Sequence, residues 1–175
     1  MSAATLTPNA LADVLPGSVV RRFTAADLAE LFVLQRCCWV SEAQANDSMN
    51  IPPLRESAEQ VLAGSLAALT LVVRIGPRPD GRLVASVRGE ERGRRQHIGR
   101  LMVAPDLAGR GIGTALLALI ESLTSTDVDE HLLFTGTGSH RNIALYQRCG
   151  YSLLDDTDPD HITGTVTLGK ARNPR

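Results

Sequence analysis

The chain has 175 residues, enough for one domain with a hydrophobic core, and its composition of 43% hydrophobic and 21% charged residues is typical of a globular protein. A formal net charge of -1 and an aromatic content of 3% argue against a nucleic-acid-binding protein, which usually carries a basic excess and stacking side chains. The apolar runs are too short to span a bilayer and the first residues lack a signal-peptide pattern, so we expect a cytoplasmic protein without a membrane partner.

The three cysteines, Cys37, Cys38 and Cys149, are an odd number without a C-x-x-C pair, which indicates a reducing compartment. We expect them to behave as small buried hydrophobic residues. No cluster of histidine and cysteine has the spacing of metal ligands, so the sequence predicts no metal site.

The sequence of the N-terminal part of the chain predicts an arm, one strand and two helices. We expect a flexible arm over residues 1–17, closed by Pro16-Gly17, and a single domain over residues 18–175. Thr24 and Ser57 are typical helix N-caps. The elements predicted here are a strand over 19–23, a helix from 24 to about 39, a loop over 41–55 and a short helix from 57 to about 64.

The rest of the chain alternates strand patterns with two helix patterns. The helix over 112–123 carries an apolar stripe at spacings of three and four residues. The helix over 141–149 has Ser139 as its expected N-cap and ends at Gly150. The predicted strands cover 69–75, 83–88, 97–103, 130–137, 151–154 and 162–168. This order predicts an α/β fold with a mixed, mostly antiparallel central sheet flanked by helices.

A glycine-bearing turn, Gly109-Arg110-Gly111-Ile112-Gly113-Thr114, connects strand 97–103 to helix 112–123. Glycines let a ligand approach the backbone, and a helix N-terminus offers unpaired N–H groups and the positive end of the helix dipole. Together these features predict a socket for a phosphate or diphosphate, with a tight turn that binds no ligand as the alternative. The turn lacks the lysine of a Walker loop, and its glycine spacing differs from that of a dinucleotide-binding loop.

Two stretches together resemble the GNAT superfamily of acetyl-CoA-dependent N-acetyltransferases. Leu101-Met-Val-Ala-Pro105 with the glycine turn resembles motif A of that family. Asn142-Ile-Ala-Leu-Tyr146-Gln-Arg-Cys-Gly150-Tyr151 resembles its C-terminal motif, usually written N-x-x-A-x-x-x-Y-x-x-x-G-F/Y. One departure is Ala108, where the family often has glutamine or arginine. Backbone N–H groups suffice in principle for a diphosphate, and Arg110 is either a replacement charge or a solvated side chain.

The resemblance implies acetyl-CoA as the acyl-donor co-substrate, bound mostly by the backbone. The diphosphate would lie on the N–H groups of the turn, and the pantetheine arm along the edge of strand 97–103, which the family separates from strand 130–137. A backbone N–H near Met102 or Val103 would stabilise the oxyanion of the tetrahedral intermediate, and Gly99 suggests a bulge just before it. The implied binding residues are Leu101, Met102, Val103, Ala108, Gly109, Arg110, Gly111, Ile112, Gly113, Thr114, Asn142 and Tyr146.

The candidate catalytic side chains follow from the resemblance and from the chemistry of amide formation. Tyr146 resembles the tyrosine that protonates the departing thiolate, and Asn142, on the same helix face, resembles the asparagine that bonds the pantetheine arm. An amine must lose a proton before it attacks, and His97, with an imidazole pKa of about 6.5, is the first candidate base. Glu90 and Glu42 are reserves, and either carboxylate could instead bind a cationic amine. The structural alternatives are a core aromatic for Tyr146, a strand-edge histidine for His97 and solvated charges for the glutamates.

We therefore expect an N-acetyltransferase that transfers the acetyl group of acetyl-CoA to a primary amine of a small molecule, amino acid or peptide, by direct attack in a ternary complex. An acyl-CoA-binding sensor on the same fold is the alternative, and the net charge argues against an acceptor carried by a nucleic acid. In the family the segment between the first two helices, here residues 39–54, shapes the acceptor pocket, so Trp39 and Met49 are candidate lining residues. The resemblance also implies a homodimer, since many relatives are dimers.

Overall fold

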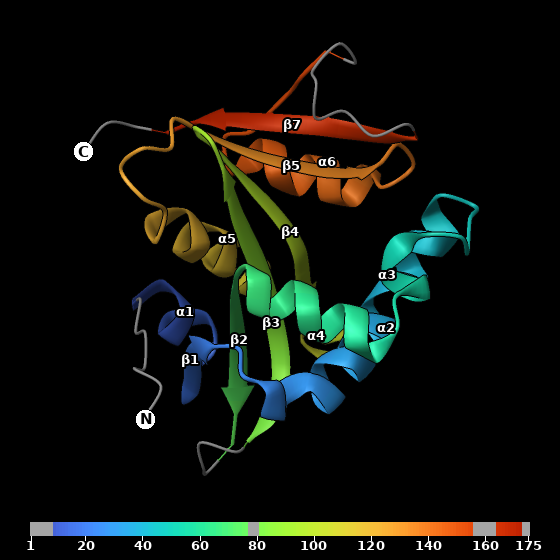
Figure 1. The fold of residues 1–175 in the computed structure, drawn as a ribbon, viewed down its shortest axis with the longest axis vertical. Helices are drawn as coiled ribbons and strands as arrows, with labels where there is room; N and C mark the ends of the chain where they lie inside the picture. The colour runs from blue at the N-terminus through green and yellow to red at the C-terminus, as the bar shows by residue number, and fades with distance from the viewer. Residues whose placement is uncertain (1–8, 77–80, 156–163, 173–175) are drawn as a thin grey trace.

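The computed structural model describes residues 9–76, 81–155 and 164–172, and these residues form one seven-stranded sheet with helices on its faces (Figure 1). The strand order is β1-β2-β3-β4-β5-β7-β6, and β4 and β5 are the one parallel pair among antiparallel neighbours. This arrangement confirms the predicted mixed, mostly antiparallel sheet. The strands are β1 (Ser18–Arg22), β2 (Leu69–Ile75), β3 (Arg82–Arg92), β4 (Arg95–Val103), β5 (Glu130–Gly136), β6 (Ser152–Leu153) and β7 (Thr165–Ala171).

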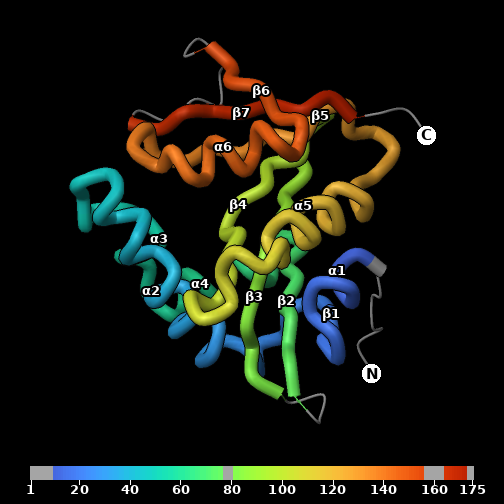
Figure 2. Tube along the Cα trace, turned by 180° about the vertical axis from the view of Figure 1, so that it is seen from behind, coloured from blue at the N-terminus to red at the C-terminus, as the bar shows by residue number. Residues whose placement is uncertain are grey.

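Two groups of helices cover opposite faces of the half of the sheet that contains β1 to β4 (Figure 2). α1 packs with α5 on one face, and α2 packs with α4 on the other, while α6 lies beside β5 and β7. The apolar stripe predicted on α5 is buried as far as Ile120, with Ile112, Leu116 and Ile120 at most 1% exposed. Leu123, its expected last member, lies just past the end of the helix and is 37% exposed. The helices are α1 (Asn9–Val14), α2 (Leu28–Ala45), α3 (Pro52–Arg55), α4 (Ala58–Ala67), α5 (Ile112–Ser122) and α6 (His140–Arg148), with 3-10 turns η1 (Ala25–Asp27) and η2 (Pro105–Leu107).

The arm expected over residues 1–17 is corrected in its described part. Helix α1 lies there, and Leu11 and Leu15 are buried in the same core as the α5 stripe. The two leucines are four residues apart, so both face the core, and this packing stabilises a helix that is too short to persist alone. Residues 1–8 of the expected arm lie outside the described residues.

Several element boundaries also differ from the prediction. α2 continues to Ala45 instead of ending near Trp39, because the following Ser41-Glu-Ala-Gln-Ala segment contains no glycine or proline. The expected loop over 41–55 therefore holds the end of α2 and the short helix α3. β3 extends to Arg92, and the predicted start of the last strand at 162 lies outside the described residues.

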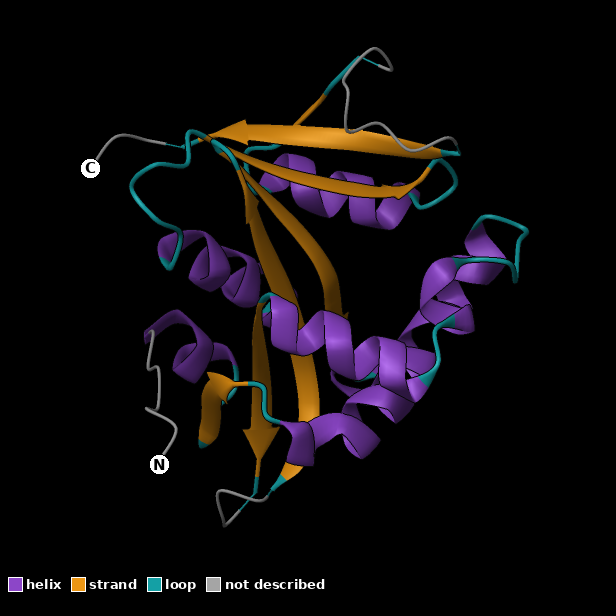
Figure 3. Cartoon of the chain, in the orientation of Figure 1, coloured by secondary structure: helices purple, strands orange, loops and turns teal. Residues whose placement is uncertain are grey.

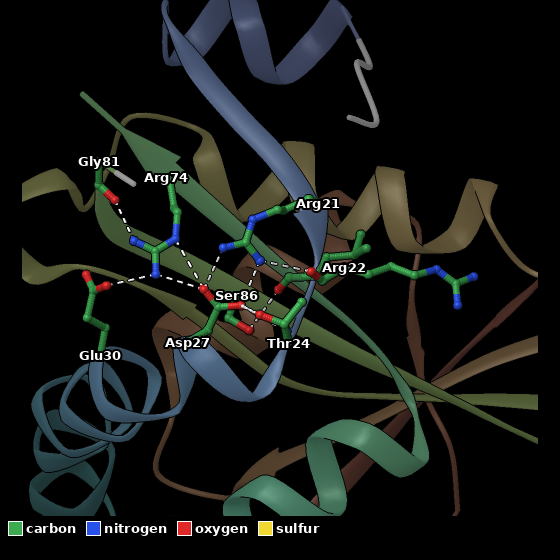
Figure 4. Close-up of polar contacts among 9 residues, drawn as sticks. Arg21, Arg22, Thr24, Asp27, Glu30, Arg74, Gly81 and Ser86 are labelled. Atoms are coloured by element: carbon green, nitrogen blue, oxygen red, sulfur yellow. Dashed lines mark hydrogen bonds and ion pairs between the residues drawn. The ribbon is translucent and has the colours of Figure 1, made fainter. Parts of the chain in front are cut away.

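A buried ionic cluster fixes the start of α2 on β1 and β2 (Figure 4). The Asp27 carboxylate, 1% exposed, accepts hydrogen bonds from Arg21 at 2.7 Å and from Arg74 at 2.8 Å. It also accepts one from the backbone N–H of Thr24 at 2.9 Å, and Arg74 donates to Glu30 at 2.8 Å. Although burial raises the pKa of Asp27, the hydrogen bonds from Arg21, Arg74 and Thr24 outweigh it and hold that pKa well below its usual range.

β4 and β5 separate soon after they begin (Figure 3). They pair only over Arg95–His97 and Glu130–Leu132, so the β4 edge from Ile98 to Val103 has no strand beside it on the β5 side. The expected separation of these strands is confirmed. The divergence opens a space between two half-sheets, one formed by β1 to β4 and the other by β5, β7 and β6.

The bulge predicted near Gly99 is also present. Ser86 and Arg88 of β3 pair with Met102 and Gly99, so β4 carries one extra residue in this interval. Arg100 lies within it with a φ of 50°, an uncommon backbone conformation for a residue other than glycine. The bulge changes the direction of the β4 edge where the strand faces the space between the two half-sheets.

Candidate active site

A cleft of about 800 Å³ lies between β4 and β5. Its walls come from β4 and the start of α5 on one side, from β5 and α6 on the other, and from the second half of α2. Of the twelve implied binding residues, all except Arg110 line this cleft. The structure therefore brings the two sequence motifs together, although about 30 residues separate them in the chain.

The glycine turn presents backbone to this cleft. Gly109 and Gly111 have φ values of 80° and 81°, a conformation that favours glycine. No atom lies within 4 Å of the position that a Cβ would take on Gly109, so the backbone there is open. α5 begins at Ile112, and its first N–H groups have no partner within the helix. The turn can therefore hold an anion with N–H donors and the positive end of the α5 dipole.

Tyr146 lies on α6 and lines the cleft, with its ring 6.3 Å from that of Tyr151 in an edge-to-face arrangement. Burial and then the negative charge of Glu42 raise the pKa of Tyr146 above its usual value of 10. The phenol therefore stays protonated at neutral pH. A protonated phenol beside a cleft can donate its proton to an anion that forms there.

Glu42 lies on α2 and joins three residues of the opposite wall. Its carboxylate accepts hydrogen bonds from the Ser139 hydroxyl at 2.5 Å and from the Asn142 side-chain N–H at 2.7 Å, and a long contact from Thr135 at 3.5 Å. The Ser139 hydroxyl is thus used across the cleft, and the expected N-cap bond of Ser139 to α6 is absent. Asn142 lines the cleft as expected, with its amide bound to Glu42.

The position of Asn142 in the C-terminal motif is corrected by the residue spacing. In the pattern the asparagine stands seven residues before the tyrosine, and in this chain that position holds Ser139, while Asn142 is only four residues before Tyr146. Ser139 lines the cleft and is 3% exposed. Counting seven residues back from Tyr146 identifies Ser139 as the residue at the asparagine position of the motif.

The end of α2 also contacts the β5–α6 loop directly, a feature that the sequence did not predict. Asn46 accepts a hydrogen bond from the backbone N–H of Gly138 and donates one to Ser139, both at 2.8 Å. A Cβ on Gly136 would lie 2.2 Å from the Asn46 side chain, and one on Gly138 would lie 2.2 Å from the carbonyl oxygen of Ala45. The two glycines therefore allow α2 to approach the loop this closely.

The middle of α2 contacts the unpaired edge of β4. The Cys38 thiol donates to the carbonyl oxygen of Val103 at 3.2 Å, and burial raises the pKa of this thiol to about 11. Cys38 is therefore a thiol and not a thiolate at neutral pH. Trp39 lines the cleft, and the Arg100 guanidinium lies 5.8 Å from the centre of its ring. Met49, the other expected lining residue, is 63% exposed and does not line the cleft.

His97 and Glu90 do not line the cleft. They face each other in the β3–β4 ladder, and His97 also pairs with Leu132 of β5 at the closed end, before the strands separate. Glu90 forms an ion pair with Arg92 at 2.9 Å and lines a separate pocket of about 250 Å³. The structure therefore leaves both residues outside the cleft that Tyr146 and Glu42 line.

Within residues 9–76, 81–155 and 164–172, no group of three or more histidine, cysteine, aspartate or glutamate side chains is arranged to hold a metal ion. In the same part of the chain, no helix is both long enough and apolar enough to cross a membrane.

Comparison with known proteins finds a family model that matches the sequence and solved structures with a similar fold. The model of the acetyltransferase (GNAT) family matches residues 29–151, whereas no curated protein sequence matches the chain significantly. The fold is similar to that of PaiA N-acetyltransferase from Thermoplasma acidophilum, solved in complex with coenzyme A (TM-score 0.72, 18% identity, 89% of this chain and 99% of that chain covered). It is also similar to the GNAT domain of S. lividans PAT (TM-score 0.71, 19% identity, 89% and 90% covered).

A third solved structure, the ribosomal-protein-S18-alanine N-acetyltransferase from Escherichia coli, has a TM-score of 0.66 and 16% identity, with 90% of this chain and 96% of that chain covered. At these identities the structures establish a common fold. The family model covers more than half of the sequence. The chain therefore belongs to the acetyltransferase (GNAT) family.

Proposed function

We propose that this protein transfers the acetyl group of acetyl-CoA to a primary amine. The observation that carries the proposal is the unpaired β4 edge, which ends next to the open glycine turn in one cleft. A thioester with a diphosphate at its far end needs both features, because the diphosphate binds N–H groups and the pantetheine amides bind a strand edge. The solved relative from Thermoplasma acidophilum that binds coenzyme A has the same fold.

The donor would be held mainly by main-chain groups. The amides from Gly109 to Thr114 would bind the diphosphate, and the edge from Leu101 to Val103 would bind the pantetheine arm. A β4 N–H near Met102 or Val103 would donate to the thioester carbonyl and stabilise the oxyanion that forms on attack. Ala108 and Thr114 line the same region, whereas Arg110 would contribute only at long range.

Tyr146 would complete the reaction by protonating the thiolate of coenzyme A as it leaves. Its raised pKa means that the phenol carries its proton at neutral pH and is available as a donor. The overall balance is an ammonium compound plus acetyl-CoA giving an amide, coenzyme A with a free thiol, and one proton. Direct attack fits the cleft better than an acyl-enzyme, because the lining cysteine, Cys38, is held as a thiol.

We do not propose His97 or Glu90 as the base that removes a proton from the acceptor amine, because neither residue lines the cleft. The acceptor class is proposed from the chemistry of a primary amine. One solved structure of similar fold is an acetyltransferase of a ribosomal-protein alanine, which supports a peptide amine as one acceptor class. Amino acids and small-molecule amines are the other classes that we propose.

The test combines binding and turnover. Calorimetry with coenzyme A should detect binding to the purified full chain, and release of the coenzyme A thiol should accompany acetyl-CoA with a panel of amines, amino acids and peptides. Binding without thiol release for any member of the panel would identify an acyl-CoA sensor in place of an enzyme. Absence of both would overturn the proposal.

A matched pair of glycine variants tests the position of the donor. Gly109 and Gly93 both have positive φ, 80° and 58°, and neither has an atom within 4 Å of a built Cβ. Gly109→Val should weaken coenzyme A binding at least tenfold, whereas Gly93→Val, in the β3–β4 turn, should leave it within twofold. Equal effects of the two substitutions would contradict binding at the glycine turn.

A further inference from the structure

Glu42 is the single carboxylate among the described residues that line the cleft. We propose that it binds the protonated amine of the acceptor, so that the site selects primary ammonium compounds. This inference rests on the proposed function and adds the side chain that recognises the acceptor. Tyr146 and the β4 edge have no charge with which to do so.

The negative charge of Glu42 is hydrogen-bonded but not neutralised. Its partners are a hydroxyl of Ser139, an amide of Asn142 and, at longer range, a hydroxyl of Thr135. Across the described part of the chain, no lysine, arginine or histidine forms an ion pair with Glu42. A partly buried carboxylate without a counter-ion favours the binding of a cation.

The arginine side chains that line the cleft do not form ion pairs with Glu42. Arg100 forms an ion pair with Glu56 at 2.6 Å, on the side of α2 that faces α3 and α4. Arg141 and Arg148 belong to α6 and are exposed. Their positive charges would attract the anionic donor and repel an ammonium group. Glu42 is thus the lining residue whose charge matches an ammonium group.

The location of Glu42 is suitable for a reacting amine. It lies one turn of α2 after Cys38, about 6 Å along the helix axis, and the Cys38 thiol contacts the Val103 carbonyl on the unpaired edge. On the other side, Glu42 binds Asn142, which lies one turn before Tyr146 on α6, and all three residues line the cleft. An amine held by Glu42 is therefore near both the strand edge and the tyrosine.

The neighbouring hydrogen bonds give the carboxylate a fixed orientation. Ser139 binds one oxygen of Glu42 and Asn142 binds the other, and Asn46 in turn donates to the Ser139 hydroxyl. A carboxylate held in this way loses little conformational entropy when it binds a ligand. Ser139 and Asn46 are thus positioning residues, and Glu42 is the group that touches the acceptor.

The principal test compares acceptors that differ in charge. Benzylamine is protonated at neutral pH, whereas benzoic hydrazide is an uncharged amine. Glu42→Gln should lower kcat/KM for benzylamine at least tenfold and change it less than threefold for benzoic hydrazide. Glu59→Gln, which removes an exposed carboxylate on α4, is the matched control and should change neither value. An equal loss for both acceptors would assign Glu42 a structural role and overturn the inference.

A binding experiment separates this inference from the proposed function. Benzamidine is a cation and benzamide is its neutral analogue, and neither is an acceptor. With coenzyme A present, the wild-type chain should bind benzamidine at least tenfold more tightly than benzamide, and Glu42→Gln should remove that preference. Thiol release by the wild-type chain, without a benzamidine preference, would leave the proposed function standing and overturn the role of Glu42. A preference that depends on Glu42, without thiol release from any amine, would overturn the function and support the cation site.

Discussion

The two ends of α2 hold the same kind of charged group in opposite ways. At the start, Asp27 and Glu30 share Arg21 and Arg74, and every charge in this cluster has a partner of opposite sign. At the end, Glu42 is held by the neutral donors of Ser139 and Asn142. The comparison teaches that one end of the helix is a closed structural anchor, while the other retains a negative charge that only a ligand would balance.

The largest effect is expected from breaking the anchor. Asp27→Asn should lower the free energy of unfolding by about 3–5 kcal/mol, because it removes the buried carboxylate that both Arg21 and Arg74 bind. Urea unfolding measures this. Asp106→Asn is the control, since its ion pair with Arg82 is exposed and should be worth less than about 1 kcal/mol.

Asp27→Asn should also change how the free energy of unfolding depends on pH in acid. The pKa of Asp27 is lower in the folded than in the unfolded chain, so its contribution is present above about pH 4 and is lost as the pH falls below that value. The wild-type chain should therefore lose more stability than Asp27→Asn when the pH is lowered from 5 to 3. Parallel curves for the two proteins would contradict the ionic account of this end.

The second largest effect is expected from Tyr146, which lines the cleft. Tyr146→Phe should lower kcat about 100-fold or more with little change in the binding of acetyl-CoA, because it removes a proton donor and keeps the ring. Steady-state kinetics and calorimetry measure the two quantities. Tyr151→Phe is a partial control, since the Tyr151 hydroxyl donates to Glu121 at 2.8 Å and not into the cleft. Normal turnover by Tyr146→Phe would remove this tyrosine from the mechanism.

The third effect is smaller and concerns the contact between α2 and the β5–α6 loop. Gly138→Ala should cost about 1–3 kcal/mol of stability, because the new methyl group would lie 2.2 Å from the Ala45 carbonyl oxygen. It should also lower kcat/KM for the acceptor, since the end of α2 must move away. Thr137→Ala changes an exposed neighbour in the same loop and should do neither. Wild-type stability in Gly138→Ala would show that the approach of α2 is not tight.

The sequence predicted those parts of the molecule that depend on local pattern. The stripe on α5, strand β2 and the glycine turn are set by residues within one element and its neighbours, and they are confirmed. The separation of β4 from β5 came from the family resemblance and is confirmed too. The cleft could be foreseen because both of its motifs are short and contiguous.

The remainder of the site could not be predicted in this way. The contacts of Glu42 with Ser139 and Asn142 join residues 97 and 100 positions apart, and no local pattern records such a distance. The prediction that α2 ends near Trp39 placed Glu42 in a loop, which concealed its position on the helix face toward α6. His97 is the converse case, because its place on a strand matched the resemblance while the closed end of the β4–β5 pair keeps it from the cleft.

The short parallel ladder between β4 and β5 has a mechanical consequence. Only three residue pairs join the two half-sheets there, so any widening would be a rotation about residues 95–97 and 130–132. At the far end of the opening, the hydrogen bonds of Asn46 to Gly138 and Ser139 resist that rotation. The width between the half-sheets is thus restrained at both ends, so acceptors of different size would have to be accommodated by the side chains that line the cleft.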